Sequence, residues 1–350
     1  MRNLFVVLSI LFLLNAFNSC KSCKNKKNDF IVKVDKKEIT KIQKQMDVDI
    51  LRYEEVLFSI DQNEMAGELS KIKKDYAFFL GDNPATPQNI KQLKGYINNN
   101  VHQDLYKEVK KQYPDLQEME EELLNAFSII KYHFPEACFP KIYTAILCLY
   151  FERPIIYEDS VLVIALDMYL GQDYTYYKQL GPMVPKYLIR RFSKEYIISD
   201  CMKNIAYDYI KYDNKKNTLL NEMITAGKCW MFTELACPQI EDSIISGYSF
   251  QKLQWAKQNE YNVWTYLIDK NYLYSKDNLL IRKFVSDAPF TSFFGNDSPG
   301  QIATWIGWQI CRAWIKNNTD KKISELLYET DAQKILQQSK YKPLKKNDSR

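Results

Sequence analysis

The spacing of apolar and polar residues predicts a helical first region, a short β-rich middle and a helical remainder. Residues 46–60 fit a short strand that runs into a helix. From about residue 63 to residue 131 apolar side chains recur at helical spacing, and the last helix of this region has to end before Pro135. Three stretches rich in Ile, Val, Leu and Tyr then predict the strands of a small sheet: 141–150, 154–159 and 160–170.

The rest of the chain returns to a helical pattern. Helical spacing resumes after residue 185 and continues to residue 237, and it covers most of the remainder apart from a loop at 286–299. The sequence shows no internal repeat, and no linker divides it after Val48. We therefore expect one α+β domain, mostly helical, with a small central sheet.

One late helix, at residues 298–318, is rich in tryptophan. Its start fits a capping box, with Ser298 as the N-cap, Pro299 at the first helical position and Gln301 as the reciprocal partner. Gly307 in its interior costs about 1 kcal/mol relative to Ala, which indicates that another element packs closely on it. The pattern predicts mainly a core helix.

The three tryptophans of this helix cannot all point the same way. Trp305 and Trp308 are three residues apart, which turns a helix by about 300°, and Trp314 lies further along. One of them should lie nearer the surface. We expect Trp308 to be that residue and a candidate for contact with a partner.

The N-terminus predicts export and a lipid anchor. Residues 1–19 combine a basic Arg2 with an apolar run at 4–14, which is shorter than the roughly 20 residues that span a bilayer. Cys20 directly after Ser19 resembles the end of a bacterial lipoprotein signal. The resemblance implies cleavage before Cys20 and lipidation of that residue, and simple secretion is the alternative.

These features divide the chain into four parts. We expect a signal peptide at 1–19, a lipidated N-terminus with a flexible tether at 20–45, the α+β domain at 46–343 and a basic disordered tail at 344–350. The residues after Cys20 are lysines, whereas some surface-exported lipoproteins carry acidic residues there. We therefore expect the domain to face the periplasm.

Composition excludes several classes of function. The net charge is only +5 and most lysines are scattered, so no basic face for nucleic acid is indicated. The 10 glycines form neither a P-loop nor a dinucleotide-binding motif. The expected domain holds six cysteines, of which most should be buried free thiols, although their spacing fixes no disulfide pairing: Cys138, Cys148, Cys201, Cys229, Cys237 and Cys311.

Several stretches together resemble the gliding-motility lipoprotein GldB family over nearly the whole mature chain. They are 132–143, 157–174, 219–232, 255–277, 288–310 and 333–343. The resemblance implies a lipoprotein that faces the periplasm, usually from the inner membrane, and serves the machinery of gliding cells, which is coupled to type IX secretion. Its partners would be other envelope proteins of that machinery. The family is also distantly related to predicted zinc peptidases, which implies a degenerate zincin-like, metalloprotease-like architecture.

The residues that a zincin mechanism needs are missing from this sequence. Such a site requires two imidazoles one helical turn apart, a third ligand and a general base. The helix in the matching place, 195–210, contains no histidine, and the only two histidines are His102 and His133. The resemblance implies a glutamate ligand before Gly227, where this chain has Ala226. We therefore expect no catalytic residues, no metal ligands and no cofactor.

Other candidate pairs are weaker. Cys138 and His133 flank a proline-containing turn, but closeness in sequence does not establish the geometry of a nucleophile and its base. Two pairs of carboxylates are better explained as solvated faces, strand-end hydrogen bonders or salt-bridge partners: Glu158 with Asp159, and Glu222 with Glu234.

Asp167 is a charge inside the apolar stretch 160–170, where burial is unfavourable unless the carboxylate is hydrogen-bonded or lies at an edge. It could mark the surviving wall of a former cleft and face a partner. The alternative, which we favour, is an acid at a strand end that faces water.

Taken together, the sequence favours a non-catalytic, lipid-anchored accessory or scaffold protein of gliding or type IX secretion machinery. Aromatic, tyrosine-rich surfaces suit protein partners. Two alternatives remain open: an envelope hydrolase with an unrecognised site, and a lipoprotein that binds glycans or peptides.

Overall fold

Four short strands form a mixed sheet in the order β1-β2-β4-β3. The structure is a computed structural model that describes residues 34–181, 184–213 and 215–345. β1 (Ile50–Arg52) and β4 (Val161–Ala165) both pair in parallel with β2 (Lys141–Ala145), and β3 (Ile155–Glu158) pairs antiparallel with β4. β4 is buried almost throughout, which explains its nearly continuous apolar sequence.

The helices of the first region begin and end at local signals. Thr86 caps α6 by accepting a hydrogen bond from Asn89 N, Pro87 follows at the first helical position, and Asn99 caps α7 in the same way. The helices before β2 are α2 (Lys36–Gln43), α3 (Tyr53–Ser59), α4 (Met65–Ile72), α5 (Ala77–Leu80), α6 (Pro87–Ile97), α7 (Asn100–Gln112) and α8 (Gln117–His133). The end of α8 before Pro135 is as predicted.

The second half is helical, as expected, with short 3-10 turns between helices. The α-helices are α9 (Thr175–Gln179), α10 (Lys186–Ile189), α11 (Ile197–Ile205), α12 (Leu219–Ala236), α13 (Asp242–Ser246), α14 (Phe250–Asp269), α15 (Asn278–Val285), α16 (Ile302–Asn317), α17 (Ile323–Tyr328) and α18 (Ala332–Ser339). The 3-10 turns are η1 (Leu166–Met168), η2 (Lys194–Tyr196), η3 (Ala206–Asp208) and η4 (Tyr272–Tyr274).

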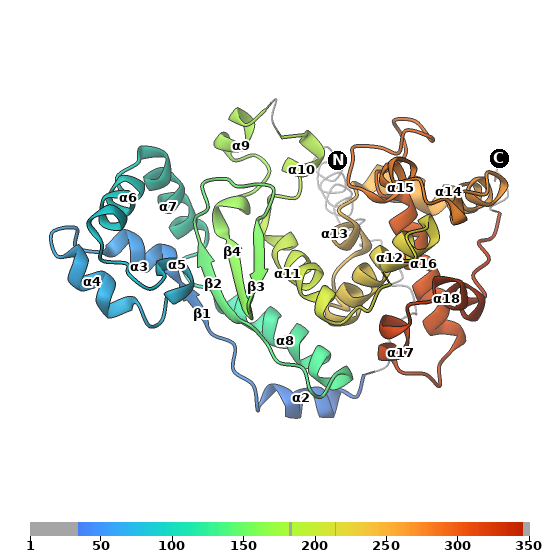
Figure 1. Cartoon of the computed structure of the whole chain (residues 1–350), viewed down its shortest axis with the longest axis horizontal. Helices are drawn as coiled ribbons and strands as arrows, with labels where there is room; N and C mark the ends of the chain where they lie inside the picture. The colour runs from blue at the N-terminus through green and yellow to red at the C-terminus, as the bar shows by residue number, and fades with distance from the viewer. Residues whose placement is uncertain (1–33, 182–183, 214, 346–350) are drawn as a thin grey trace, which may run out of the picture. The chain divides into compact units, whose positions relative to one another are not determined.

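Helices cover both faces of the sheet, so that alternate side chains of each strand enter different clusters (Figure 1). Tyr143 and Val163 join a small cluster with residues of α3 to α6, whereas Ile142, Leu162 and Ile164 face the main core, to which α8, α11 and α12 contribute. The prediction of one mostly helical α+β domain with a small central sheet is confirmed.

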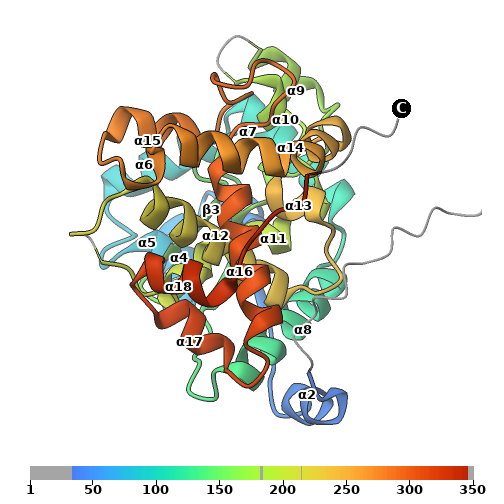
Figure 2. The ribbon, with the colours of Figure 1, turned by 90° about the vertical axis from the view of Figure 1, so that its right-hand side faces the viewer.

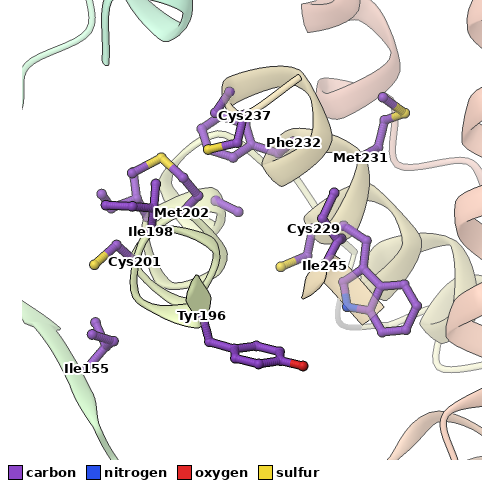
Figure 3. Close-up of a cluster of buried hydrophobic side chains, with 14 of the residues drawn as sticks. Ile155, Tyr196, Ile198, Cys201, Met202, Cys229, Met231, Phe232, Cys237 and Ile245 are labelled. Carbon is purple, nitrogen blue, oxygen red and sulfur yellow. The ribbon is translucent and has the colours of Figure 1, made fainter. Parts of the chain in front are cut away.

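The main core joins the sheet to α11 and α12. In Figure 3, Ile198, Cys201 and Met202 of α11 lie between Ile155 of β3 and Phe232 of α12. These side chains are nearly or fully buried. α11 therefore serves as the packing layer between the sheet and the C-terminal helices.

A close helix crossing explains the glycine of the tryptophan-rich helix. A Cβ built at Gly307 of α16 would lie 1.8 Å from the carbonyl oxygen of Met223 in α12, and one built at Gly227 would lie 2.3 Å from the carbonyl carbon of Gly307. No side chain fits between the two backbones. The predicted close approach at Gly307 is confirmed, and Figure 2 shows α16 among α12, α14, α15, α17 and α18.

Two local predictions were wrong. α16 begins at Ile302 rather than after Ser298, and its N-cap Gln301 has a left-handed φ of 54° and makes no side-chain capping bond. The Ser298 hydroxyl instead donates to Gly295 O at 2.7 Å and bonds Thr291 within the preceding loop. Ser298 therefore forms hydrogen bonds within the preceding loop and does not serve as the N-cap that the local pattern predicts.

The folded region begins earlier than predicted. Residues 36–43, which we placed in the flexible tether, form α2, capped by the side chain of Asp35. Gln43 in this helix bonds Asn125 of α8 through Nε2 and Oδ1 at 2.6 Å. Within the part of the chain that the structure describes, no helix is both long and apolar enough to cross a membrane.

Candidate functional site

A groove of about 410 Å³ opens between α12, the segment that follows α11 and the start of α18. One wall is the α12 face that carries Glu222, Ala226 and Lys228. The other sides come from residues 207–213 with Lys216, from residues 329–335, and from Val285 of α15. The groove is thus built from segments that are far apart in the sequence.

Exposed tyrosines form the rim of this groove. Tyr207 and Tyr212 line it, and 63% and 59% of their surfaces are accessible to solvent. Tyr328, 42% exposed, lies beside it with the Lys211 ammonium 4.9 Å from its ring centre. Large exposed aromatic side chains gathered around a concave surface are typical of a site that binds another molecule.

A buried lysine forms part of the groove wall. Lys228 is only 1% exposed, and its Nζ donates to the backbone carbonyls of Leu327 at 3.3 Å and Glu329 at 2.5 Å. Burial lowers the pKa of Lys228 to about 8, because the charged form loses hydration that carbonyl dipoles replace only in part. Perturbed lysines in clefts are enriched at functional sites.

Basic and acidic side chains line the groove in equal number. Lys211, Lys216 and Lys228 line it together with three acidic residues: Asp213, Glu222 and Glu329. Of these, Glu329 is paired with Lys334, Nζ to Oε2, at 2.5 Å, and this partner lowers its pKa. Burial raises the pKa of Glu222. Because Glu329 already has Lys334 as its partner, the lysines of the lining are compatible with an occupant that carries a carboxylate.

One of the two places that the resemblance to zinc peptidases singled out lies in this groove. Ala226 lines it, and the next residue, Gly227, packs against the backbone of α16. In α11, Asp200 pairs with Lys203 of the same helix at 3.1 Å and accepts a hydrogen bond from the Tyr169 hydroxyl at 3.2 Å. Among the described residues, no three His, Cys, Asp or Glu side chains are arranged so that they could hold a metal ion.

The prediction that Trp308 lies near the surface was wrong, because Trp308 is 0% exposed. Its Nε1 donates to Glu234 Oε2 at 2.8 Å, and the Arg312 guanidinium lies 3.7 Å from its ring centre. Arg312 also bonds both oxygens of Glu234 and pairs with Asp242 at 2.6 Å. Since α16 is surrounded by other helices, turning a tryptophan away from one neighbour directs it toward another rather than into solvent.

Asp167 lies in η1, directly after β4, and is fully buried, so the interpretation that it faces water was also wrong. Its two carboxylate oxygens accept hydrogen bonds from Leu147 N at 2.9 Å and Leu149 N at 2.7 Å. Burial raises the pKa of Asp167 to about 6, against the opposing effect of these two bonds. A buried Asp167 cannot contact a partner directly, but it fixes the loop that follows β2.

Several of the remaining candidates make contacts within the fold. His133 is half-buried, which lowers its pKa to about 4, and the Cys138 thiol donates to the Glu136 carbonyl at 3.8 Å rather than to His133. Glu158 pairs with Arg153 at 2.5 Å, and Glu234 with Arg312, as expected for salt-bridge partners. All six cysteines of the described region are free, and four of them are buried, as predicted: Cys201, Cys229, Cys237 and Cys311.

The structure also brings together one pair that the sequence did not reveal. The Cys148 sulfur and the His102 Nε2 atom are 3.0 Å apart, although 46 residues separate them in the chain. No local motif could have indicated this contact, because Cys148 lies in the loop after β2 and His102 lies in α7, far apart in the sequence.

Comparison with known families identifies the chain. A model of the gliding motility protein GldB family matches residues 33–343. The chain belongs to this family. As a GldB-family member it is a lipoprotein related to gliding motility, which implies association with a membrane. The match begins ahead of α2, in agreement with the early start of the folded region.

No curated protein and no solved structure matches the chain significantly. The predicted lipidation site Cys20 and the signal peptide at 1–19 lie outside the described residues, as does most of the predicted tail at 344–350.

Proposed function

We propose that this GldB-family protein is a non-catalytic accessory protein that binds a segment of another envelope protein in the tyrosine-rimmed groove. In this proposal it is anchored through a lipid on Cys20, faces the periplasm from the inner membrane, and serves gliding or type IX secretion machinery. The family match and its lipoprotein character support the anchor. The groove is the observation that carries the binding role.

The chemistry of the groove favours a polypeptide segment with an acidic side chain. Tyr207 and Tyr212 provide two large rings, each with a polar hydroxyl, and such side chains are enriched at the centres of protein interfaces. Lys228 lines the groove, and its ammonium group donates hydrogen bonds to two backbone carbonyls, those of Leu327 and Glu329. In a partly desolvated groove, the electrostatic attraction between this ammonium group and a carboxylate of the partner is stronger than it would be in water.

The absence of the expected ligand residues supports the non-catalytic part of this proposal. If the scaffold is a degenerate zincin, the helix at 195–210 should carry the paired histidines, and this stretch contains none. The place of the third ligand is taken by the methyl group of Ala226. The groove would then be the remnant of a catalytic cleft that has been kept for docking.

The test is co-purification after crosslinking in membranes of the native host. We expect the wild-type protein to recover a small set of motility or secretion proteins, and Cys20→Ala to lose them because the anchor is gone. Tyr207→Ala and Tyr212→Ala, still anchored, should also lose them. Phe250→Ala is the matched control, since Phe250 is 69% exposed but does not line the groove.

The outcomes separate the two parts of the proposal. If the groove variants recover the same proteins as Phe250→Ala, the groove is not the docking site, and the proposed role of the tyrosines is wrong. If the wild-type protein recovers no partner, the accessory role itself fails. Stoichiometric metal in the purified protein, or hydrolysis of peptides or peptidoglycan, would instead favour an envelope hydrolase.

A glycan- or peptide-binding lipoprotein is the second candidate, and the exposed tyrosine rings favour it over the hydrolase. Titration calorimetry with soluble peptidoglycan fragments distinguishes it from protein docking. Saturable binding that Tyr212→Ala abolishes would support this candidate, whereas no heat change at millimolar fragment would exclude it.

A further inference from the structure

We propose that Cys148 and His102 form a thiol-exchange site, at which the Cys148 sulfur attacks a disulfide and forms a mixed disulfide with part of it. This site is separate from the groove and does not depend on the docking role. Cys148 is solvent-exposed, and its Sγ lies 3.0 Å from His102 Nε2. A nucleophile and a base at hydrogen-bonding distance are the minimal arrangement for such chemistry.

The orientation of the imidazole suits the role of base. His102 Nδ1 lies 2.9 Å from the Tyr96 carbonyl oxygen, and the ring packs against the Tyr96 ring with centres 4.3 Å apart. Because a carbonyl oxygen can only accept, Nδ1 carries the hydrogen of the neutral ring. The lone pair of Nε2 then faces the Cys148 thiol.

The loop that carries Cys148 is held in an unusual conformation. Cys148 and Leu149 have φ values of 57° and 61°, in the left-handed region that residues with side chains rarely adopt. The buried Asp167 carboxylate bonds the amides of Leu147 and Leu149 and thereby maintains this turn after β2. Strained residues persist where their surroundings hold them, and they occur frequently at functional sites.

The same hydrogen bonds distinguish between two kinds of thiol chemistry. Acyl transfer needs backbone amides near the nucleophile that are free to stabilise an oxyanion. The amides on either side of Cys148, those of Leu147 and Leu149, donate to Asp167 instead. Disulfide exchange develops its charge on sulfur and needs no oxyanion hole. The geometry therefore favours a disulfide over an ester or amide as the substrate.

The exchange is balanced without any further reagent. His102 Nε2 takes the proton of the Cys148 thiol as the sulfur attacks R–S–S–R′. A bond forms between Cys148 and the sulfur of R, the original S–S bond breaks, and R′ leaves as a thiolate that recovers the proton from the imidazolium. One thiol and one disulfide are present before and after the step. Desolvation raises the pKa of the Cys148 thiol, with a smaller contribution from Asp167 and an opposing one from the Tyr96 hydroxyl, so the sulfur is protonated at neutral pH and needs the base.

The experiment uses the full-length chain purified in detergent and the aromatic disulfide DTNB as the probe. Mass spectrometry of quenched samples gives a separate labelling rate for each cysteine. Cys138 is the internal control, because it is also exposed but has a backbone carbonyl, rather than a histidine, as its neighbour. We expect Cys148 to react about 10-fold or more faster than Cys138 at pH 7, since general bases contribute factors of this size or larger.

The variant His102→Gln should bring the Cys148 rate down to that of Cys138. Equal rates at the two cysteines, or an unchanged rate in a folded His102→Gln variant, would overturn the proposal. Oxidised glutathione and a disulfide-bonded peptide, used as alternative probes, distinguish a small disulfide from a polypeptide one by their relative rates.

Discussion

The crossing of α12 and α16 offers the most direct test of the packing, through the substitution Gly307→Ala. The added Cβ would lie 1.8 Å from the Met223 oxygen and 2.5 Å from its carbonyl carbon. Ordinary contact begins near 3.4 Å, so the two backbones would have to separate by about 1.6 Å. Because the obstacle is helix backbone, no side chain can rotate away to make room.

Two opposing contributions set the magnitude. Inserting a methyl group into a packed core costs about 1–3 kcal/mol, and we take the upper end because backbone must move. Replacing glycine by alanine inside a helix returns about 1 kcal/mol. We therefore expect Gly307→Ala to lower the free energy of unfolding by about 2 kcal/mol.

Gly95→Ala is the matched control. Gly95 lies inside α6, and a Cβ built there meets no atom within 4 Å. Only the helix propensity applies, so this variant should be more stable than wild type by up to about 1 kcal/mol. Both variants replace glycine by alanine inside a helix, so opposite changes in the free energy of unfolding have to come from the surroundings of the two positions.

Urea denaturation followed by tryptophan fluorescence measures both variants. Gly307→Ala should lower the midpoint at an unchanged slope, which would identify a loss of stability rather than a change in the unfolded state. The reasoning about the crossing is refuted if Gly307→Ala is as stable as wild type, or gains stability as Gly95→Ala does.

Three further substitutions test the buried charges. Arg312→Met leaves the carboxylates of Glu234 and Asp242 without their main partner and should cost about 3–5 kcal/mol in urea denaturation, and a loss below 1 kcal/mol would contradict the network. Asp167 has a pKa of about 6 in the fold against 3.8 for the free side chain, so the folded state binds more protons between these values, and wild type should lose about 3 kcal/mol relative to Asp167→Asn as pH rises through that window. Lys228 has the opposite effect, because its pKa falls from 10.5 to about 8: wild type should gain about 3 kcal/mol relative to Lys228→Met between pH 8 and 10.5. Parallel pH profiles of wild type and variant would contradict either assignment.

The strands and most helices were predictable because their signals are local. β2 and β4 lie within apolar runs that no exposed helix would carry, and α8 ends where Pro135 requires it. The cap of α16 was not predictable, since Ser298 has the right residue type but forms its hydrogen bonds with Thr291 and Gly295. A local motif cannot indicate when a tertiary contact will compete for the same hydroxyl.

The candidate sites depend on contacts between distant segments, and for that reason the sequence did not reveal them. In the sequence Lys228 is an ordinary helical lysine, and only the fold brings the carbonyls of Leu327 and Glu329 to its ammonium group. Trp308 was misplaced because helical geometry fixes the angles between side chains but not the number of neighbouring helices. Asp167 was placed in water because the two amides that bind its carboxylate belong to a different loop.

The pairing of β1 with β2 determines the order in which the chain can fold. Ile50 pairs with Ile142, so a chain that is made from its N-terminus exposes β1 long before its partner strand exists. The helices from α3 to α8 lie between the two strands and can form through local contacts during this interval. Closing so long a loop is entropically unfavourable and slow compared with helix formation. We therefore expect β1, although first in the sheet by sequence, to be among the last segments to gain protection from hydrogen exchange during refolding.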